Sequence, residues 1–141
     1  PLAQTNMQGL KAWMRQNPSK LAEVLGQNPS YVFFRTTTGA ADEGPIGALG
    51  APLTGEYSAA IDKHHVELGA PIFVATTHPL NNKPHNRLIM AQDTGSAIKG
   101  GVRVDYYWGY GDAAGEVAGK MKHPGQVWML LPNGYTPRYQ P

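Results

Sequence analysis

The chain has 141 residues, of which 41% are hydrophobic, with a formal net charge of +2 and no cysteine. This length suits one domain, with or without a small appendage, and the hydrophobic content can fill a core. The absence of cysteine excludes disulfides, thiolate metal sites and cysteine nucleophiles. The longest apolar runs fall far short of the roughly 20 residues that span a bilayer. The basic residues are scattered rather than gathered on one face, which argues against nucleic-acid binding.

The N-terminal part of the chain has the pattern of short helices. Apolar residues recur at helical intervals between residues 7 and 14, and a second helical pattern follows Asn17. Asn17 can cap that second helix and Pro18 suits its first position, while Gly26 fits its end. We therefore expect a helical segment over residues 1–29, with a role in packing. Because the chain begins with proline and not methionine, we expect a processed product or a fragment.

The pattern changes to short strands after a turn near residue 29. The 17 glycines and 12 prolines are spread among apolar runs, which indicates a loop-rich β structure rather than disorder. A long loop over residues 36–56 is expected to be functional or mobile, and a short helix is expected over 115–120. The strand-like runs are 31–34, 57–61, 72–76, 87–91, 102–107 and 127–131. Their irregular spacing predicts a mainly β domain over 30–141, either a small closed barrel or a sandwich.

Two aspartates bracket the most specific stretch of the chain. An apolar run leads into Asp93, and a glycine-rich loop connects Asp93 to a second apolar run that carries Asp105. Carboxylates held on rigid strands suit acid/base chemistry, and glycines let a substrate approach the backbone. Asp93 fits either a turn aspartate bonded to backbone N–H groups or a carboxylate that faces a cleft. Asp105 interrupts a strand, where aspartate is depleted, and this favours a functional role.

The other polar and aromatic candidates have weaker signals. Asp62 is expected to form an Asx-turn or a cap, and Lys99 is either a solvated loop lysine or a ligand for an anionic substrate group. The histidines show no convincing set of metal ligands, so we expect no metal site. They are His64, His65, His78, His85 and His123. An aromatic cluster over residues 106–110 follows Asp105 and suits stacking on sugar rings.

Several short motifs occur in an order and spacing typical of one family. They are YVFFR at 31–35, GALGAPL at 47–53, AID at 60–62, LGAP at 68–71, AQDTGSAIKG at 91–100 and VDYYWGYG at 104–111. Over roughly residues 7–141 the chain resembles the C-terminal part of membrane-bound lytic murein transglycosylase A, including its three-aspartate domain. Because the family's enzymes are longer, we expect this chain to be the C-terminal part of such an enzyme.

The resemblance implies a fold, a reaction and roles for particular residues. The implied fold is a double-psi β-barrel over 30–141, beside a smaller β domain, with a glycan groove between them. The implied reaction cuts the β-1,4 bond between N-acetylmuramic acid and N-acetylglucosamine in peptidoglycan, with 1,6-anhydromuramic products and no cofactor. Asp105 matches the catalytic acid/base, with Asp93 in the same groove and Asp62 in support. The glycan-binding candidates are Lys99, Gly95, Tyr107 and Tyr110.

The resemblance also implies partners and a location. The partners are the glycan strands of peptidoglycan, with no nucleic acid. The membrane is reached only through an N-terminal lipid anchor outside this chain, which implies the periplasm at the outer membrane. Two other functions stay open. One is a non-catalytic glycan-binding barrel. The other is a retropepsin-like aspartic protease built on residues 93–96 in a homodimer, which would leave Asp105 and the aromatic cluster unexplained.

Overall fold

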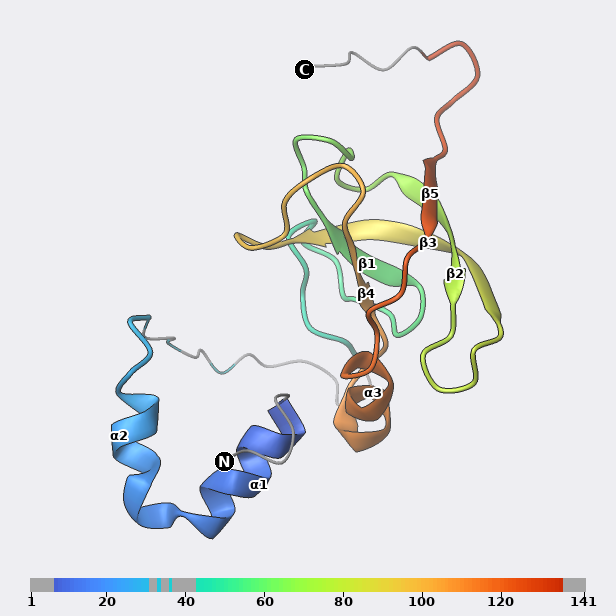
Figure 1. Ribbon diagram of the computed structural model, residues 1–141. Helices are drawn as coiled ribbons and strands as arrows, with labels where there is room; N and C mark the ends of the chain where they lie inside the picture. The colour runs from blue at the N-terminus through green and yellow to red at the C-terminus, as the bar shows by residue number, and fades with distance from the viewer. Residues whose placement is uncertain (1–6, 31–32, 34–35, 37–42, 136–141) are drawn as a thin grey trace. The chain divides into compact units, whose positions relative to one another are not determined.

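A computed structural model describes residues 7–30, 33, 36 and 43–135 of the chain (Figure 1). The chain divides into two compact units, Pro1–Gly39 and Ala40–Pro141. The predicted division between residues 29 and 30 stays a prediction. Within the described residues, no helix has the length and apolar character needed to cross a membrane.

The first unit contains the predicted helices: α1 (Met7–Gln16), a single 3-10 turn η1 (Pro18–Lys20) and α2 (Leu21–Leu25). The predicted capping role of Asn17 is wrong, because its side chain makes no cap for the segment that follows. Its amide instead donates to the carbonyl oxygen of Trp13 at 2.8 Å. The last carbonyls of a helix lack intrahelical partners, so this bond closes the end of α1.

The second unit is built on a five-stranded sheet with the order β4-β1-β3-β2-β5. β1 and β3 are parallel, and the other neighbouring pairs are antiparallel. The strands are β1 (Ser58–Ile61), β2 (Pro71–Thr77), β3 (Pro84–Thr94), β4 (Val104–Tyr107) and β5 (Gln126–Met129). Each overlaps a run predicted from the sequence. The strand predicted over 31–34 lies outside the described residues, apart from Phe33, which is in no strand.

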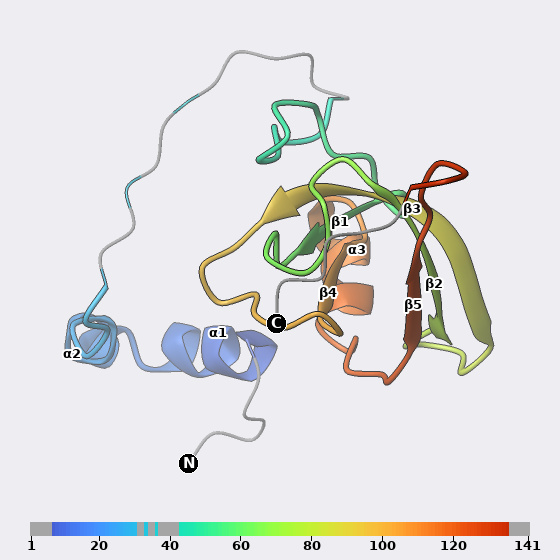
Figure 2. The ribbon, with the colours of Figure 1, turned by 90° about the horizontal axis from the view of Figure 1, so that it is seen from above.

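One face of this sheet carries the hydrophobic core. The buried residues alternate along the strands, as expected when successive side chains point to opposite faces. They include Ala59, Ile61, Ile72, Val74, Ile89 and Ala91, and Val104, Tyr106, Val127 and Met129 pack against them. Figure 2 shows the long β3 bending strongly, so that the sheet curls around this core. The predicted mainly β fold is confirmed, although the described strands form an open sheet and not a closed barrel.

The helix predicted over 115–120 lies earlier in the chain, as α3 (Gly111–Ala118). Two glycines with positive φ, Gly109 at 109° and Gly111 at 83°, turn the chain sharply after β4. This conformation is disfavoured for residues with a Cβ atom, so the glycines permit the helix to start directly after the turn. In both views α3 lies next to the end of β4 (Figures 1 and 2).

Candidate active site

Asp93 and Asp105 lie on either side of one residue of β1. Asp105 is the register partner of Ala60 across the antiparallel β1–β4 pair, and Asp93 is its partner across the parallel β1–β3 pair. Residues that face each other in a sheet project from the same face. Neighbouring strands lie about 4.8 Å apart, so about 10 Å separates the two aspartates at their backbones. The fold thus brings the two aspartates onto one face without placing their carboxylates in contact.

A β-bulge in β3 determines where Asp93 lies. Ala59 pairs with Ala91, but the next residue, Ala60, pairs with Asp93, so that Gln92 is the extra residue. A bulge of this kind changes the face on which the following residues project. The Gln92 side chain accepts a hydrogen bond from the buried Ser58 hydroxyl at 2.5 Å.

The loop before β1 packs against the end of β3 and reaches the Asp93 carboxylate. The Ala48 N–H donates to Oδ1 of Asp93 at 2.9 Å, and the Leu49 N–H donates to the Gln92 carbonyl oxygen at 3.0 Å. A Cβ atom at Gly47 would lie 2.5 Å from that carbonyl oxygen, so this close approach requires glycine. Asp93 therefore accepts a backbone N–H, as the turn interpretation predicts, but from a segment 45 residues earlier in the chain.

Asp105 forms a two-pronged ion pair that sequence reasoning missed. Arg103 donates from Nε to Oδ1 of Asp105 at 2.8 Å and from Nη2 to Oδ2 at 3.0 Å. Its Nη1 donates to the Ala97 carbonyl oxygen at 2.6 Å. The hydrogen bonds that Arg103 donates to Asp105 raise the pKa of Arg103, with the charge of Asp105 as a second cause. A signal was available, because residues two apart in an extended segment share a face.

Asp62 anchors the glycine-rich loop that connects Asp93 to Asp105. It is 6% exposed and accepts the His64 N–H on Oδ1 at 3.1 Å, which is the predicted Asx-turn. It also accepts the Gly100 N–H on Oδ2 at 2.9 Å. These two backbone hydrogen bonds, that from Gly100 first, lower the pKa of Asp62 to about 2. Asp62 therefore stays ionised and structural at neutral pH.

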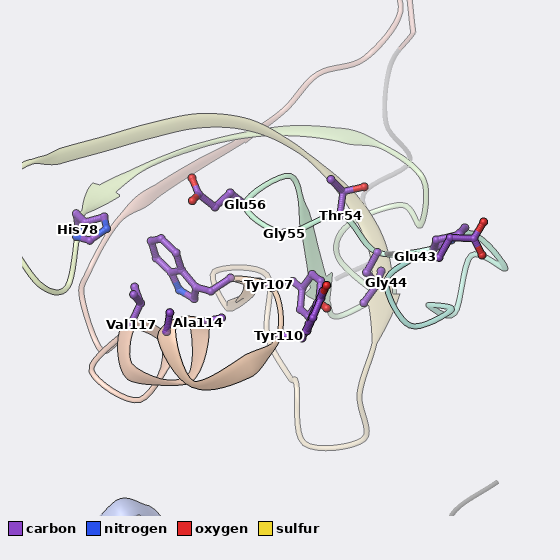
Figure 3. Close-up of a pocket in the computed structure, with 15 residues that line it drawn as sticks. Glu43, Gly44, Thr54, Gly55, Glu56, His78, Tyr107, Tyr110, Ala114 and Val117 are labelled. Atoms are coloured by element: carbon purple, nitrogen blue, oxygen red, sulfur yellow. The ribbon is translucent and has the colours of Figure 1, made fainter. Parts of the chain in front are cut away.

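The predicted glycan-binding residues line separate cavities. Tyr107 and Tyr110 line a cavity of about 670 Å³ beside α3. Figure 3 shows Ala114 and Val117 of α3 along one side of it and His78 at one end. Lys99 and Gly95 line a smaller cavity of about 170 Å³, together with Asp62.

Asp105 and Arg103 line a third cavity, of about 350 Å³. Trp108 lines both this cavity and the cavity of about 670 Å³, which makes the two adjacent. The indole N–H of Trp108 is buried and has no hydrogen-bond partner among the described residues. The structure thus brings Asp105 close to the cavity of Tyr107 and Tyr110, through a tryptophan that the sequence marked only as part of an aromatic cluster.

An aromatic cluster borders these two cavities, formed by the buried His85 and the partly buried His78, Tyr106 and Trp108. The Tyr106 hydroxyl donates to the Glu56 carbonyl oxygen at 2.5 Å, so Nε2 of His85, 3.0 Å away, must donate to that hydroxyl. Burial, followed by the charge of Arg87, lowers the pKa of His85. Burial also raises the pKa of Tyr106 to about 12. Both rings are therefore neutral packing groups at neutral pH.

Comparisons with known proteins agree with the motifs of the sequence. Residues 57–131 match the family described as the 3D domain, and residues 1–35 match the MltA specific insert domain. A curated relative, membrane-bound lytic murein transglycosylase A of Escherichia coli strain K12, is 36% identical over 132 residues. That match covers 89% of this chain and 35% of the relative.

Solved structures agree as well. The crystal structure of MltA from Neisseria gonorrhoeae is 69% identical with a TM-score of 0.87, covering 97% of this chain and 35% of that one. E. coli MltA with bound chitohexaose is 33% identical with a TM-score of 0.76, covering 89% of this chain and 38% of that one. This chain spans about a third of the length of the relatives that it matches. The chain therefore belongs to the 3D domain family, and its matches to the MltA specific insert domain and to the curated relatives support the family of membrane-bound lytic murein transglycosylase A.

Proposed function

We propose that this chain supplies the catalytic carboxylate of a lytic transglycosylase that acts on peptidoglycan. The enzyme would cut the β-1,4 bond between N-acetylmuramic acid and N-acetylglucosamine and release 1,6-anhydromuramic ends. The names of the curated relatives and the chitohexaose bound to the E. coli relative support this proposal.

One observation carries the assignment of the acid/base to Asp105. It lies on β4, at the edge of the sheet, where its side chain is 42% exposed and borders a cavity of about 350 Å³. A carboxylate at a sheet edge is accessible to a polymer that runs past it. Asp62, in contrast, is buried and its two oxygens accept backbone N–H groups, so it suits support and not proton transfer.

The proposed reaction uses one carboxyl group twice. Protonated Asp105 gives its proton to the bridging oxygen as the bond from C1 to that oxygen breaks, through an oxocarbenium-like transition state. The C6 hydroxyl of the muramic acid then attacks C1, and its proton passes to the Asp105 carboxylate. Asp105 thus regains the proton that it gave to the leaving group, and no water is consumed. Because the nucleophile belongs to the same sugar ring, positioning supplies much of the rate acceleration.

Asp93 has a secondary role in this scheme. Its backbone lies about 10 Å from that of Asp105, and the two carboxylates are bonded to different groups, Ala48 and Arg103, so the scheme gives them no shared proton. We propose that it orders the loop at Ala48, to which it is hydrogen-bonded, and adds negative potential along the glycan path. Tyr107 and Tyr110 would contact sugar rings in the cavity beside Asp105, and Lys99 and Gly95 would contact a more distant part of the substrate.

The proposed setting follows the family. Curated relatives are named membrane-bound, and we propose periplasmic action at the outer membrane, with a lipid anchor carried outside these residues. We also propose that residues 1–29 belong to a neighbouring helical segment and that 30–141 contribute to the barrel. The glycan strands of peptidoglycan are the partner.

The test is product analysis. The full-length protein is incubated with purified sacculi, and the soluble fragments are analysed by mass spectrometry. The proposal expects anhydromuramic ends, whose mass is one water lower than that of hydrolysed ends. Hydrated reducing ends would contradict the proposal and show that the protein is a hydrolase. Binding to sacculi with no released fragments would contradict the proposal and show that the protein is a non-catalytic glycan-binding barrel.

A further inference from the structure

We infer that Arg103 is a positioning residue that sets the charge state and the direction of the Asp105 carboxyl during catalysis. The inference rests on the proposed function, because it assumes that Asp105 is the acid/base. It is carried by the two hydrogen bonds from Arg103 to the two oxygens of Asp105, at 2.8 and 3.0 Å, and by the third bond from Arg103 to Ala97.

The pairing leaves no room for the acid form of Asp105. A guanidinium has only donors, and a protonated carboxyl must direct its O–H toward an acceptor. With both oxygens bound to Arg103, Asp105 is held as a carboxylate and cannot donate a proton. The protonated form therefore requires that Arg103 release at least one of the two oxygens.

This requirement gives Arg103 a role in each half of the reaction. When the glycan occupies the site, one oxygen of Asp105 turns to the bridging oxygen while the other stays bonded to Arg103, which keeps the carboxyl oriented. As the proton leaves Asp105, negative charge forms beside the guanidinium and is stabilised by a charge-assisted hydrogen bond. The proton that returns from the C6 hydroxyl restores the acid form. Arg103 itself stays protonated throughout.

Arg103 also connects Asp105 to the loop that precedes β4. Its bond to the Ala97 carbonyl oxygen holds one part of this loop, and the bond from the Gly100 N–H to Asp62 holds another. Gly100 has a φ of 97°, so the loop turns sharply between these two anchors. Lys99 lies in this loop and lines the cavity of about 170 Å³. Arg103 therefore links the position of this loop to the geometry of its ion pair with Asp105.

The charges around Asp105 leave Arg103 as the dominant one. The cavity that Asp105 borders has Arg103 and Tyr106 as its other titratable lining residues, and α3 and the segment after it contribute Ala118 and Met121 there. Across β1 the neighbour is Ala60, and Asp93 lies one strand further, about 10 Å away. Lys99 lies in the loop that Arg103 holds. Since both partners are about half exposed, with 48% and 42% of their side chains accessible, solvent screens the pair.

Two substitutions in the full-length protein separate the charge of Arg103 from its forked shape. Arg103→Gln removes the charge, which favours the protonated carboxyl. We expect the alkaline limb of the pH–rate profile to move up by about one pH unit, the low end of the range for an opposite charge at contact. The rate at saturating substrate should fall about tenfold.

Arg103→Lys keeps the charge but not the two parallel hydrogen bonds. The alkaline limb should therefore stay in place, while the rate at saturating substrate still falls. The KM for sacculus fragments should change little in both variants.

The matched control is Lys120→Gln, which removes the cation of an exposed ion pair between Lys120, just after α3, and Glu116 within α3. It should leave the pH–rate profile unchanged. The inference is overturned if Arg103→Gln keeps the wild-type alkaline limb, or if Arg103→Lys moves the limb as far as Arg103→Gln does. These results are distinct from failure of the proposed function, in which the wild-type protein would yield no anhydromuramic products.

Discussion

Asp93 and Asp105 are both register partners of Ala60, one from β3 and the other from β4. The parallel β1–β3 pair and the antiparallel β1–β4 pair therefore place two carboxylates in one row across the sheet. The row places them two strand spacings apart, about 10 Å, so they act as separate groups and not as a dyad that shares a proton. Because of this separation, we expect substitutions of Asp93 and of Asp105 to reduce activity to different extents.

Asp105→Asn is expected to lower the rate of anhydromuramic product formation by about 10² to 10⁴, the usual contribution of general acid/base catalysis. The side chain is 42% exposed, so the melting temperature should change little. The rate is measured on purified sacculi with the full-length protein. Asp112→Asn, an exposed acidic residue in the first turn of α3, serves as the control and should keep wild-type activity. A variant of Asp105 with more than half the wild-type rate would show that another residue is the acid.

Asp93→Asn is expected to impair activity less than Asp105→Asn does. At about 10 Å in water, two unit charges interact by only about 0.4 kcal/mol, before screening by salt. Loss of the negative charge favours the carboxylate form of Asp105, so the alkaline limb of the pH–rate profile should move down, by less than about 0.5 pH unit. The pH–rate profile is measured between roughly pH 4 and 7. A shift of more than one unit would mean that the two carboxylates approach each other in the working enzyme.

Asp62→Asn is expected to destabilise the 3D domain, because an amide can accept from only one of the two N–H groups, those of His64 and Gly100. The melting temperature should fall by several degrees at pH 7. The folded-state pKa is about 2, below the ordinary 3.8. The stability from the ionised group is therefore complete above pH 3.8 and is lost as the pH falls toward 2.

The difference in melting temperature between the wild-type protein and Asp62→Asn should accordingly narrow as the pH falls from 3.8 toward 2. Thermal unfolding followed by circular dichroism at several pH values measures it. A constant difference from pH 7 down to pH 2 would contradict the assigned ionisation.

Tyr106→Phe is expected to destabilise the protein by about 1–3 kcal/mol, the usual cost of leaving buried polar groups without partners. The hydroxyl joins the Glu56 carbonyl oxygen to Nε2 of His85, and both would lose their partner. Denaturant unfolding measures the change, with the exposed Tyr135→Phe as the control. If the two variants unfold at the same denaturant concentration, the buried network does not stabilise the fold.

The local pattern of the sequence determined the strands and the family. Short apolar runs bounded by turn residues predict β2 and β3. The stretch from Asp93 to Asp105 carries the resemblance to the family. The Asx-turn of Asp62 is also local, because its partner is the N–H of His64, two residues later in the chain. The capping prediction for Asn17 failed because its amide has a choice of partners, and the end of the preceding helix offered a free carbonyl.

Only the tertiary structure decided how these pieces face one another. A shift of one residue in register moves every side chain of a strand to the other face, so the bulge at Gln92 decides that Asp93 pairs with Ala60. The bond from Ala48 to Asp93 joins segments 45 residues apart. The third bond of Arg103, to Ala97, depends on the path of the intervening loop. Periodicity records which face a residue occupies within its own strand, whereas pairing across strands depends on contacts between distant segments, which no local pattern contains.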